Sequence, residues 1–340
     1  MNRLDRPPTC ARIRIGTLMI ALLQFALPAL AQSSATHAVP TAAAWPTKPI
    51  RILVGFPAGS TPDGAARALV DPLSKALGQA VIVENKVGAS GNIATDQIAK
   101  ANDDHTLGVV INGNLTSAKM LSPKLPYDPA HDFSLLTLVG SAPLILVAQA
   151  DAPSGKAFFD AAKTASASWN YGSVGTGSVA HLGMELLKSR VPGLTPAHIP
   201  YPGNPQVVTA LLGKQIDMAL VPPGLALPQI KAGKLKAIGL TSGRSTLAAD
   251  IPSLSDAGVN DFQLEVWTAL VGPSSLSAAA KARLAQTLPE VLRQPETRQQ
   301  LFNLGWQAPA IASAAALQQR VSTETQIMQN IIRQLGIKGQ

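Results

Sequence analysis

A short apolar run followed directly by a turn and a helix constrains this chain more than any other feature. Residues 52–54 are apolar and partly β-branched, which is typical of a strand buried on both faces, and turn residues at 55–60 interrupt them. Thr61 is a suitable helix N-cap, while Pro62 and Asp63 suit the first helical turn. Open α/β sheets bind ligands at such strand ends, and free backbone N–H groups at a helix N-terminus favour anions. We therefore expect one wall of an anion-binding pocket here.

Strand-like and helix-like segments alternate along the rest of the chain. Further strands are predicted at residues 80–83, 107–111, 170–174, 197–199, 218–221 and 235–241. Further helices are predicted at residues 93–101, 154–165, 179–189, 205–212, 278–293 and 314–335. This alternation is typical of an α/β fold with a mainly parallel sheet.

Two long apolar stretches divide the chain into two lobes. Residues 135–148 and 262–272 have the composition of strands and are predicted to cross from one lobe to the other. We expect residues 45–147 and 264–340 to form the first lobe and residues 148–263 to form the second. A chain of this length has enough residues for two hydrophobic cores. The C-terminal helices are expected to fold back on the first lobe.

The N-terminal segment has the pattern of a secretory signal peptide. Four arginines precede an apolar run at residues 15–30, and an A-x-A site ends at Ala31. A membrane anchor is the weaker interpretation, because polar residues and a proline interrupt the short run. We expect cleavage after Ala31 and export to the periplasm, with residues 1–31 removed and residues 32–44 forming a flexible leader. The single cysteine, Cys10, lies in the removed part, so the mature chain needs no disulfide.

Charge and aromatic content argue against nucleic-acid binding. Removal of residues 1–31 takes away four Arg and one Asp, which lowers the formal net charge from +8 to +5. The remaining basic residues are scattered, and aromatic residues make up only 4% of the chain, so stacking platforms for bases are not expected. Beyond Ala31 no run is long and apolar enough to span a membrane, and we expect a soluble exported protein.

A glycine-rich turn at residues 175–180 fits the pattern G-x-G-x-x-A between a strand and a helix. A dinucleotide site also needs an acidic residue about 20 positions further on, and the chain has none there. Two interpretations remain open. Backbone amides and the hydroxyls of Thr176 and Ser178 hold an anionic group, or the segment is a plain turn between strand and helix.

Catalytic and metal-binding patterns are missing from the sequence. It contains neither a P-loop nor a G-x-S-x-G elbow, and no H-x-x-x-H pair accompanies the five histidines. We therefore predict no catalytic residue, no metal site and no cofactor. His181, one turn into its helix, is expected to be a structural hydrogen-bonding residue rather than a base. Asp63 has two open interpretations, a residue that stabilises the helix dipole or an acceptor that faces the ligand cleft.

An ordered series of short motifs covers nearly the whole chain after residue 45. The motifs are Trp45-Pro46 with Pro49-Ile50, Phe56-Pro57-Ala58-Gly59 with Asp63 and Ala66-Arg67, Val83-Glu84-Asn85-Lys86, Gly88-Ala89-Ser90-Gly91-Asn92-Ile93, Lys124-Leu125-Pro126-Tyr127-Asp128-Pro129 with Asp132-Phe133, Tyr171 with Gly175 and Gly177, His181-Leu182, Pro200-Tyr201 with Gly203, and Ile230-Lys231-Ala232-Gly233-Lys234-Leu235. In this order they resemble the exported substrate-binding proteins of tripartite tricarboxylate transporters, the Bordetella uptake gene type.

The resemblance implies a periplasmic binding protein of type II, with two lobes that close on a ligand held between them. It also implies a small organic carboxylate as ligand, integral-membrane permease subunits as a transient partner, no cofactor and a monomeric state. Carried over position by position, the ligand-binding candidates are Pro57, Ala58, Gly59, Asp63, Gly88, Ser90, Gly91, Asn92, Gly175, Thr176, Gly177, Ser178 and Tyr201.

The chain departs from the family pattern at three places. Ser60 replaces the usual second glycine of the first loop, and residues 103–105 replace a common Asp-Gly-Tyr. Residues 219–223, Ala-Leu-Val-Pro-Pro, replace a stretch that is typically polar and acidic. If this stretch forms a wall of the cleft, it favours a carboxylate with a hydrocarbon or aromatic body over citrate.

Two functions other than transport are also compatible with an exported chain of this kind or need to be excluded. A ligand sensor would present the same carboxylate to a signalling receptor, and neighbouring genes for a permease or for a sensor kinase would separate the two roles. An exported hydrolase is disfavoured, because the sequence shows no arrangement of a nucleophile and a base.

Overall fold

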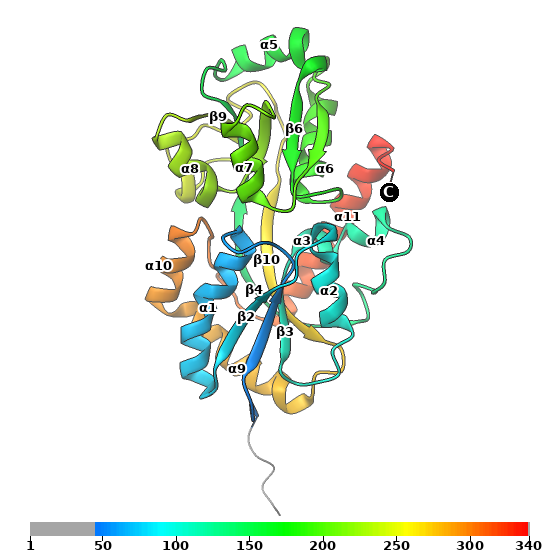
Figure 1. Cartoon of the computed structure of the whole chain (residues 1–340), viewed down its shortest axis with the longest axis vertical. Coiled ribbons are helices and arrows are strands. Elements are labelled where there is room, and N and C mark those ends of the chain that lie inside the picture. Colours follow the sequence, from blue (N-terminus) through cyan, green and yellow to red (C-terminus); the bar gives the residue numbers. More distant parts are fainter. Residues whose placement is uncertain (1–44, 339–340) are drawn as a thin grey trace, which may run out of the picture. The chain divides into compact units, whose positions relative to one another are not determined.

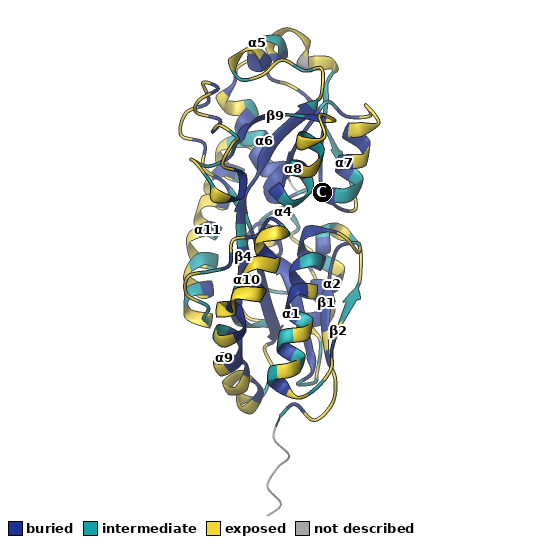
Figure 2. Cartoon of the chain, turned by 90° about the vertical axis from the view of Figure 1, so that its left-hand side faces the viewer, coloured by how far each residue is buried: buried dark blue, intermediate teal, exposed yellow. Residues whose placement is uncertain are grey.

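The computed structural model describes residues 45–338, where two five-stranded sheets form two lobes (Figure 1). The predicted signal peptide and leader, residues 1–44, lie outside the described residues, as do residues 339–340. Strands and helices alternate in both lobes, which confirms the predicted two-lobed α/β fold. Figure 2 shows that the central strands of the sheets are buried, while the helices around them expose their outer faces.

The first lobe contains the strand order β2-β1-β3-β10-β4. Its strands are β1 (Ile50–Val54), β2 (Val81–Asn85), β3 (Thr106–Ile111), β4 (Phe133–Pro143) and β10 (Glu265–Pro273). β1 pairs in parallel with both β2 and β3, as predicted, whereas β10 runs antiparallel to β3 and β4. The antiparallel strand is the one that returns from the second lobe, so it enters the sheet from the opposite end.

The second lobe repeats this arrangement with the order β7-β6-β8-β5-β9. Its strands are β5 (Ile145–Gln149), β6 (Asn170–Ser173), β7 (Ala197–Pro200), β8 (Met218–Val221) and β9 (Leu235–Leu240). β6 is parallel to β7 and β8, while β5 is antiparallel to β8 and β9. The stretch predicted as one crossing strand is therefore two strands, β4 and β5, which belong to different sheets and are separated only by Leu144.

Helices cover the sheets and occupy most of the connections. They are α1 (Thr61–Leu77), α2 (Asn92–Ala99), α3 (Asn112–Leu115), α4 (Ala118–Leu121), α5 (Lys156–Ala165), α6 (Val179–Arg190), α7 (Asn204–Leu212), α8 (Pro223–Lys231), α9 (Ala278–Arg293), α10 (Pro295–Asn303) and α11 (Ala314–Leu335), with short 3-10 turns η1 (Ala89–Gly91), η2 (Ser166–Ser168) and η3 (Thr246–Ala248). Among residues 45–338, no helix has both the length and the apolar character that crossing a membrane requires.

Helix α1 packs its apolar stripe on the first sheet. Ala66, Leu69 and Leu73 recur at helical spacing and are at most 1% exposed, in one cluster with β1 and β3 residues. The N-cap is Ser60 and not the predicted Thr61, because Thr61 already has helical geometry. The helix ends at Gly78, whose φ of 70° suits a left-handed C-cap.

Helix α11 contacts the cores of both lobes. Leu317, near its start, is buried with Trp267 of β10, whereas Met328 and Ile331 are buried in the core of the second lobe. The C-terminal helix therefore packs against the first sheet and then continues to the second lobe. The sequence predicted only the first of these contacts.

Candidate ligand-binding site

A cavity of about 500 Å³ lies between the two lobes, where the strands of both sheets end. The first lobe contributes the β2–α2 loop, the end of β3 and the short helix α4. The second lobe contributes the β6–α6 and β7–α7 loops. The lining residues are Val87, Gly88, Ala89, Ser90, Asn92, Ile111, Gly113, Asn114, Ala118, Leu121, Ser122, Val174, Gly175, Thr176, Gly177, Ser178, Pro200, Tyr201 and Pro202.

The first-lobe wall is a turn with unusual backbone geometry. Ala89, Ser90 and Gly91 have φ values of 46°, 55° and 89°, so two non-glycine residues adopt left-handed conformations. Such conformations cost about 1–3 kcal/mol each and concentrate at binding sites, where the surrounding structure holds them in place. Helix α2 begins directly after this turn, and its N-cap Gly91 has no side chain to accept the first backbone N–H groups. The turn therefore places a helix N-terminus without a side-chain cap at the cavity.

A buried network of amides holds this turn in place. The Asn114 amide Nδ2 donates to the Ser90 carbonyl at 3.0 Å and to Asn92 Oδ1 at 2.8 Å, while Asn114 Oδ1 accepts the N–H of Ile111 at 3.2 Å. The Tyr127 hydroxyl lies 2.8 Å from Asn92 Oδ1 and 3.0 Å from the Asn114 carbonyl. Burial raises the pKa of Tyr127, so its hydroxyl stays protonated as a donor. Asn114 thus connects the end of β3 to the strained turn.

The second-lobe wall is the glycine-rich turn before α6. Gly175 and Gly177 have φ values of 113° and 83°, which glycine adopts without strain. Ser178 is the N-cap of α6, where its Oγ accepts the N–H of His181 at 3.3 Å and donates to the Gly175 carbonyl at 2.7 Å. The motif is thus an ordered helix N-terminus at the cavity. Tyr201, whose N–H donates to the Ser173 carbonyl at 2.8 Å, completes this wall.

Two neutral histidines support the second-lobe turn from behind. The His181 Nδ1 accepts the N–H of Gly177 at 3.3 Å, in agreement with the structural role predicted for this residue. The His198 ring stacks on Tyr171, and its Nε2 lies 2.7 Å from Ser173 Oγ. Burial lowers the pKa of His181 and lowers that of His198 to about 4, with the nearby His181 adding to the shift of His198. Both rings are therefore uncharged near neutral pH.

No charged side chain is among the residues that line the cavity. Its polar groups are backbone amides, hydroxyls and side-chain amides, while Val87, Ile111, Leu121 and Val174 add apolar surface. Within residues 45–338, no group of three or more His, Cys, Asp or Glu is placed to hold a metal ion. The arrangement is chemically suited to binding a small organic anion through neutral donors.

The predicted site residues fall into two groups. The cavity lining includes Gly88, Ser90, Asn92, Gly175, Thr176, Gly177, Ser178 and Tyr201. The other predicted residues, Pro57, Ala58, Gly59, Asp63 and Gly91, are not part of the lining. Gly91, the last residue of the strained turn, instead packs against Phe56, because a Cβ on it would lie 2.8 Å from the Phe56 ring.

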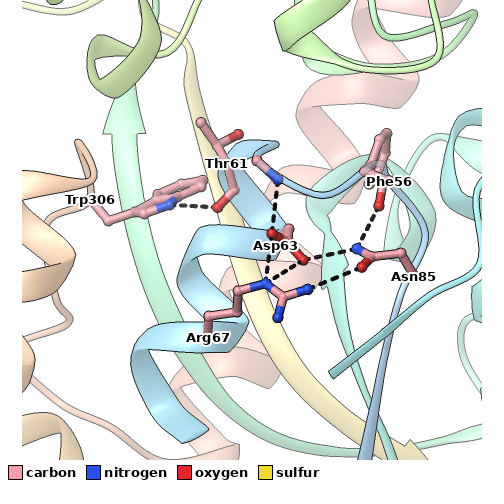
Figure 3. Close-up of polar contacts among 7 residues, drawn as sticks. Phe56, Thr61, Asp63, Arg67, Asn85 and Trp306 are labelled. Atoms are coloured by element: carbon pink, nitrogen blue, oxygen red, sulfur yellow. Dashed lines mark hydrogen bonds and ion pairs between the residues drawn. The ribbon is translucent and has the colours of Figure 1, made fainter. Parts of the chain in front are cut away.

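Asp63 is directed at its own lobe. Its carboxylate accepts the N–H of Gly59 at 2.9 Å, the Asn85 amide at 2.9 Å and the Arg67 Nε at 3.0 Å, and Figure 3 shows these groups around it. Burial alone would raise the pKa of Asp63, but the hydrogen bonds from Arg67, Asn85 and Gly59 hold it below the usual range. In this structure the residue closes the first loop onto α1 rather than facing the cavity.

Several lining residues were missed by the sequence interpretation. The small polar residues 112–114 directly follow the strand predicted at 107–111, and this position at the edge of the sheet is a signal for Gly113 and Asn114. Leu121 and Ser122 carry no comparable signal, since only the fold brings α4 to the other lobe. Leu121 of α4 lies close to Gly177 of the second lobe: a Cβ added to Gly177 would lie 3.0 Å from the Leu121 side chain. Residues 219–223 are not among the lining residues of this cavity. β8 is buried, and Leu220 and Pro222 line a small adjoining pocket of about 20 Å³ that shares Ile111, Val174 and Ser178 with the cavity.

Comparison with known proteins agrees with this architecture. Residues 65–337 match the tripartite tricarboxylate transporter family receptor. An Agrobacterium vitis protein described as UPF0065, from the TAR-I ttuE-ttuC' intergenic region, is 31% identical over 298 residues, which cover 86% of each chain. The structure of the periplasmic binding protein BugD is similar with a TM-score of 0.82 and 27% identity, over 87% of this chain and 100% of BugD.

A second solved structure, MatC from Rhodopseudomonas palustris with bound malate, has a TM-score of 0.79 and 28% identity, over 85% of this chain and 100% of MatC. The relatives and structural neighbours are binding proteins and not enzymes. The chain therefore belongs to the tripartite tricarboxylate transporter receptor family, whose members are periplasmic solute-binding proteins of the Bordetella uptake gene type.

Proposed function

We propose that this protein captures a small organic carboxylate in the periplasm and delivers it to the membrane permease of a tripartite tricarboxylate-type transporter. One observation carries the proposal: the N-termini of α2 and α6 meet at a single cavity that no charged side chain lines. Helix N-termini present free N–H groups and partial positive charge, which suit a carboxylate. The bound malate of the relative MatC supports this class of ligand.

The lining suggests how the ligand is held. In the proposal, Ser90, Asn92 and the backbone of Gly88 bind it from the first lobe, while Thr176, Ser178 and Tyr201 bind it from the second. The apolar surface of Ile111, Leu121 and Val174 contacts its hydrocarbon part. Several negative charges in a cavity without cations are costly to desolvate. We therefore expect a carboxylate with an apolar body to bind better than citrate, now because of these residues and not because of β8.

The proposal includes the route to the periplasm and the encounter with the permease. Export would follow cleavage after Ala31, and the mature protein would act as a monomer without a cofactor. The contact with the permease subunits would be transient, because the ligand has to be released there. Deletion of the gene should abolish uptake of the ligand by cells, and restoring the wild-type gene should restore it.

A ligand screen tests the binding function directly. A ligand that binds only the native state raises the melting temperature, so purified protein should melt higher with one chemical group from a panel of mono-, di- and tricarboxylates and amino acids. Sulfate, phosphate and uncharged analogues of each hit are the matched controls. Mass spectrometry of the denatured protein detects a ligand retained from expression. A protein that carries no retained ligand and responds to none of the organic anions would contradict the proposal.

Asn114→Ala should weaken binding of the carboxylate found in the screen. The substitution removes the bonds to the Ser90 carbonyl and Asn92, and it leaves the Ile111 N–H without its acceptor. Each lost bond in a buried network costs about 1–3 kcal/mol, so we expect Kd to rise roughly tenfold or more. Isothermal titration calorimetry measures the change. Asn303→Ala, on the outer helix α10, is the control, and equal Kd values for both variants would refute the role of Asn114.

A further inference from the structure

Two glycines, one in each lobe, bring their backbones together outside the ligand cavity. Gly224 lies in the first turn of α8 in the second lobe, and Gly305 follows α10 in the first. A Cβ on Gly224 would lie 2.1 Å from the Leu304 carbonyl oxygen, and one on Gly305 would lie 2.2 Å from the Gly224 nitrogen. Neither glycine lines the cavity. Because backbone meets backbone, neither position has room for a side chain while the lobes are in contact.

The first-lobe side of this contact is firmly held. Trp306, 1% exposed, donates its indole N–H to the Thr61 carbonyl at 3.0 Å, as Figure 3 shows, and its backbone N–H to the Leu301 carbonyl at 2.8 Å. The Leu304 side chain packs on α1, 3.4 Å from where a Cβ on Gly64 would lie. The loop is thus tied to the N-terminus of α1 and cannot move away without breaking these contacts.

The two positions require glycine for different reasons. Gly305 has a φ of 82°, so a side chain there would be strained even in an isolated lobe. Gly224 is a helical residue outside the positive-φ region, and alanine suits such a backbone better than glycine. The obstacle to a side chain at Gly224 therefore comes from the opposite lobe. Figure 1 shows α8 facing α10 across the junction between the lobes.

We propose that Gly224 is a positioning residue that sets ligand affinity by permitting the two lobes to close. This inference rests on the proposed function, because it assumes that a ligand is held between the lobes. A side chain at position 224 leaves the open arrangement unaffected and disfavours only the closed one. When the binding-competent state is less populated, the apparent Kd rises by the same factor.

Gly224→Ala and Gly224→Val separate this role from a local structural one. We expect Kd for the carboxylate to rise roughly tenfold for alanine and further for valine, because overpacking commonly shifts equilibria by such factors. In single-molecule FRET, with one dye on an exposed residue of each lobe, both variants should show a smaller closed population. The melting temperature of unliganded Gly224→Ala should stay equal or rise, since alanine is the better helix former.

Gly243→Ala is the matched control, because Gly243 is exposed and a Cβ there meets nothing within 4 Å. It should keep the wild-type Kd and FRET distribution. Wild-type values of both quantities in Gly224→Ala and Gly224→Val would overturn the inference. A wild-type protein that binds no carboxylate would refute the proposed function, whereas the FRET populations of unliganded proteins would still decide the role of Gly224. The inference about Gly224 would also be overturned if the wild type showed no closed population at all, with or without carboxylates.

Discussion

Asp63→Ala will destabilise the first lobe and weaken ligand binding, although Asp63 does not line the cavity. The Asp63 side chain is 2% exposed, and its carboxylate accepts hydrogen bonds from the Gly59 N–H, the Asn85 amide and Arg67. Alanine leaves the Gly59 N–H and the Asn85 amide without this acceptor. Removing a buried charged partner costs about 2–4 kcal/mol, an estimate that allows for the half-exposed Arg67 regaining water. Loss of the Gly59 bond also frees the first loop, which contacts the second lobe through Pro57 and Gly203. Chemical denaturation and calorimetric titration measure the two effects.

The pH dependence gives this prediction a second test. Because the pKa of Asp63 is lower in the folded protein than in the unfolded chain, its contribution is complete above the ordinary aspartate pKa of about 4. The contribution is lost as the pH falls through the lower folded value. Wild type should therefore exceed Asp63→Asn in stability at neutral pH, and the difference should shrink below about pH 4. The exposed Asp71 on the same helix is the control, and if Asp71→Ala and Asp63→Ala were equally stable, the prediction would fail.

Glu324→Ala will produce a comparably large loss of stability at the junction of α11 with β10. The buried carboxylate of Glu324 accepts the Asn112 amide at 2.6 Å and the Trp267 indole N–H at 2.5 Å, with Arg320 at 3.5 Å. Alanine leaves two buried donors without their acceptor and creates a cavity, so we expect a loss of about 3–5 kcal/mol in the free energy of unfolding. Asn112 follows β3 directly, next to the cavity lining, so ligand affinity should fall too. Thermal and chemical unfolding give the first value and calorimetric titration the second.

Glu324→Gln tests whether the charge or the hydrogen bonds matter more. Burial raises the pKa of Glu324 more than the hydrogen bonds from Trp267 and Asn112 and the Arg320 charge lower it. Since the folded pKa exceeds the unfolded one, the stability from this group is greatest below the usual glutamate pKa and falls as the pH rises through the folded value. Glutamine keeps one acceptor and carries no charge, so Glu324→Gln should lower the free energy of unfolding less than Glu324→Ala does. Gln326→Ala, exposed on α11, is the control, and Glu324→Ala with wild-type stability would contradict the prediction.

Much of the fold and part of the candidate site were predictable from local patterns. The buried strand β8 and the helices α9 and α11 have the predicted bounds, because an uninterrupted apolar run or a long helical periodicity leaves few alternatives. The glycine-rich turns at 88–91 and 175–177 were recognised for the same reason: few other residues adopt such backbone conformations. Helices α8 and α10 were missed because they are short, and Pro228 inside α8 also interrupts its helical pattern.

By itself the sequence determined the two-lobed α/β fold, the parallel strands with ligand loops at their ends, and the family. The family rests on the ordered series of short motifs. The other features rest on backbone preferences and on the spacing of apolar residues, which are local properties of the chain. Only the tertiary structure decided that Asp63 turns to Gly59 and Asn85, that Asn114 and Leu121 line the cavity, that β8 does not, and that Gly224 meets Gly305. Apart from the bond between Asp63 and Gly59, which lie four residues apart, these features depend on contacts between segments distant in the chain, and such contacts leave no periodic trace in either segment.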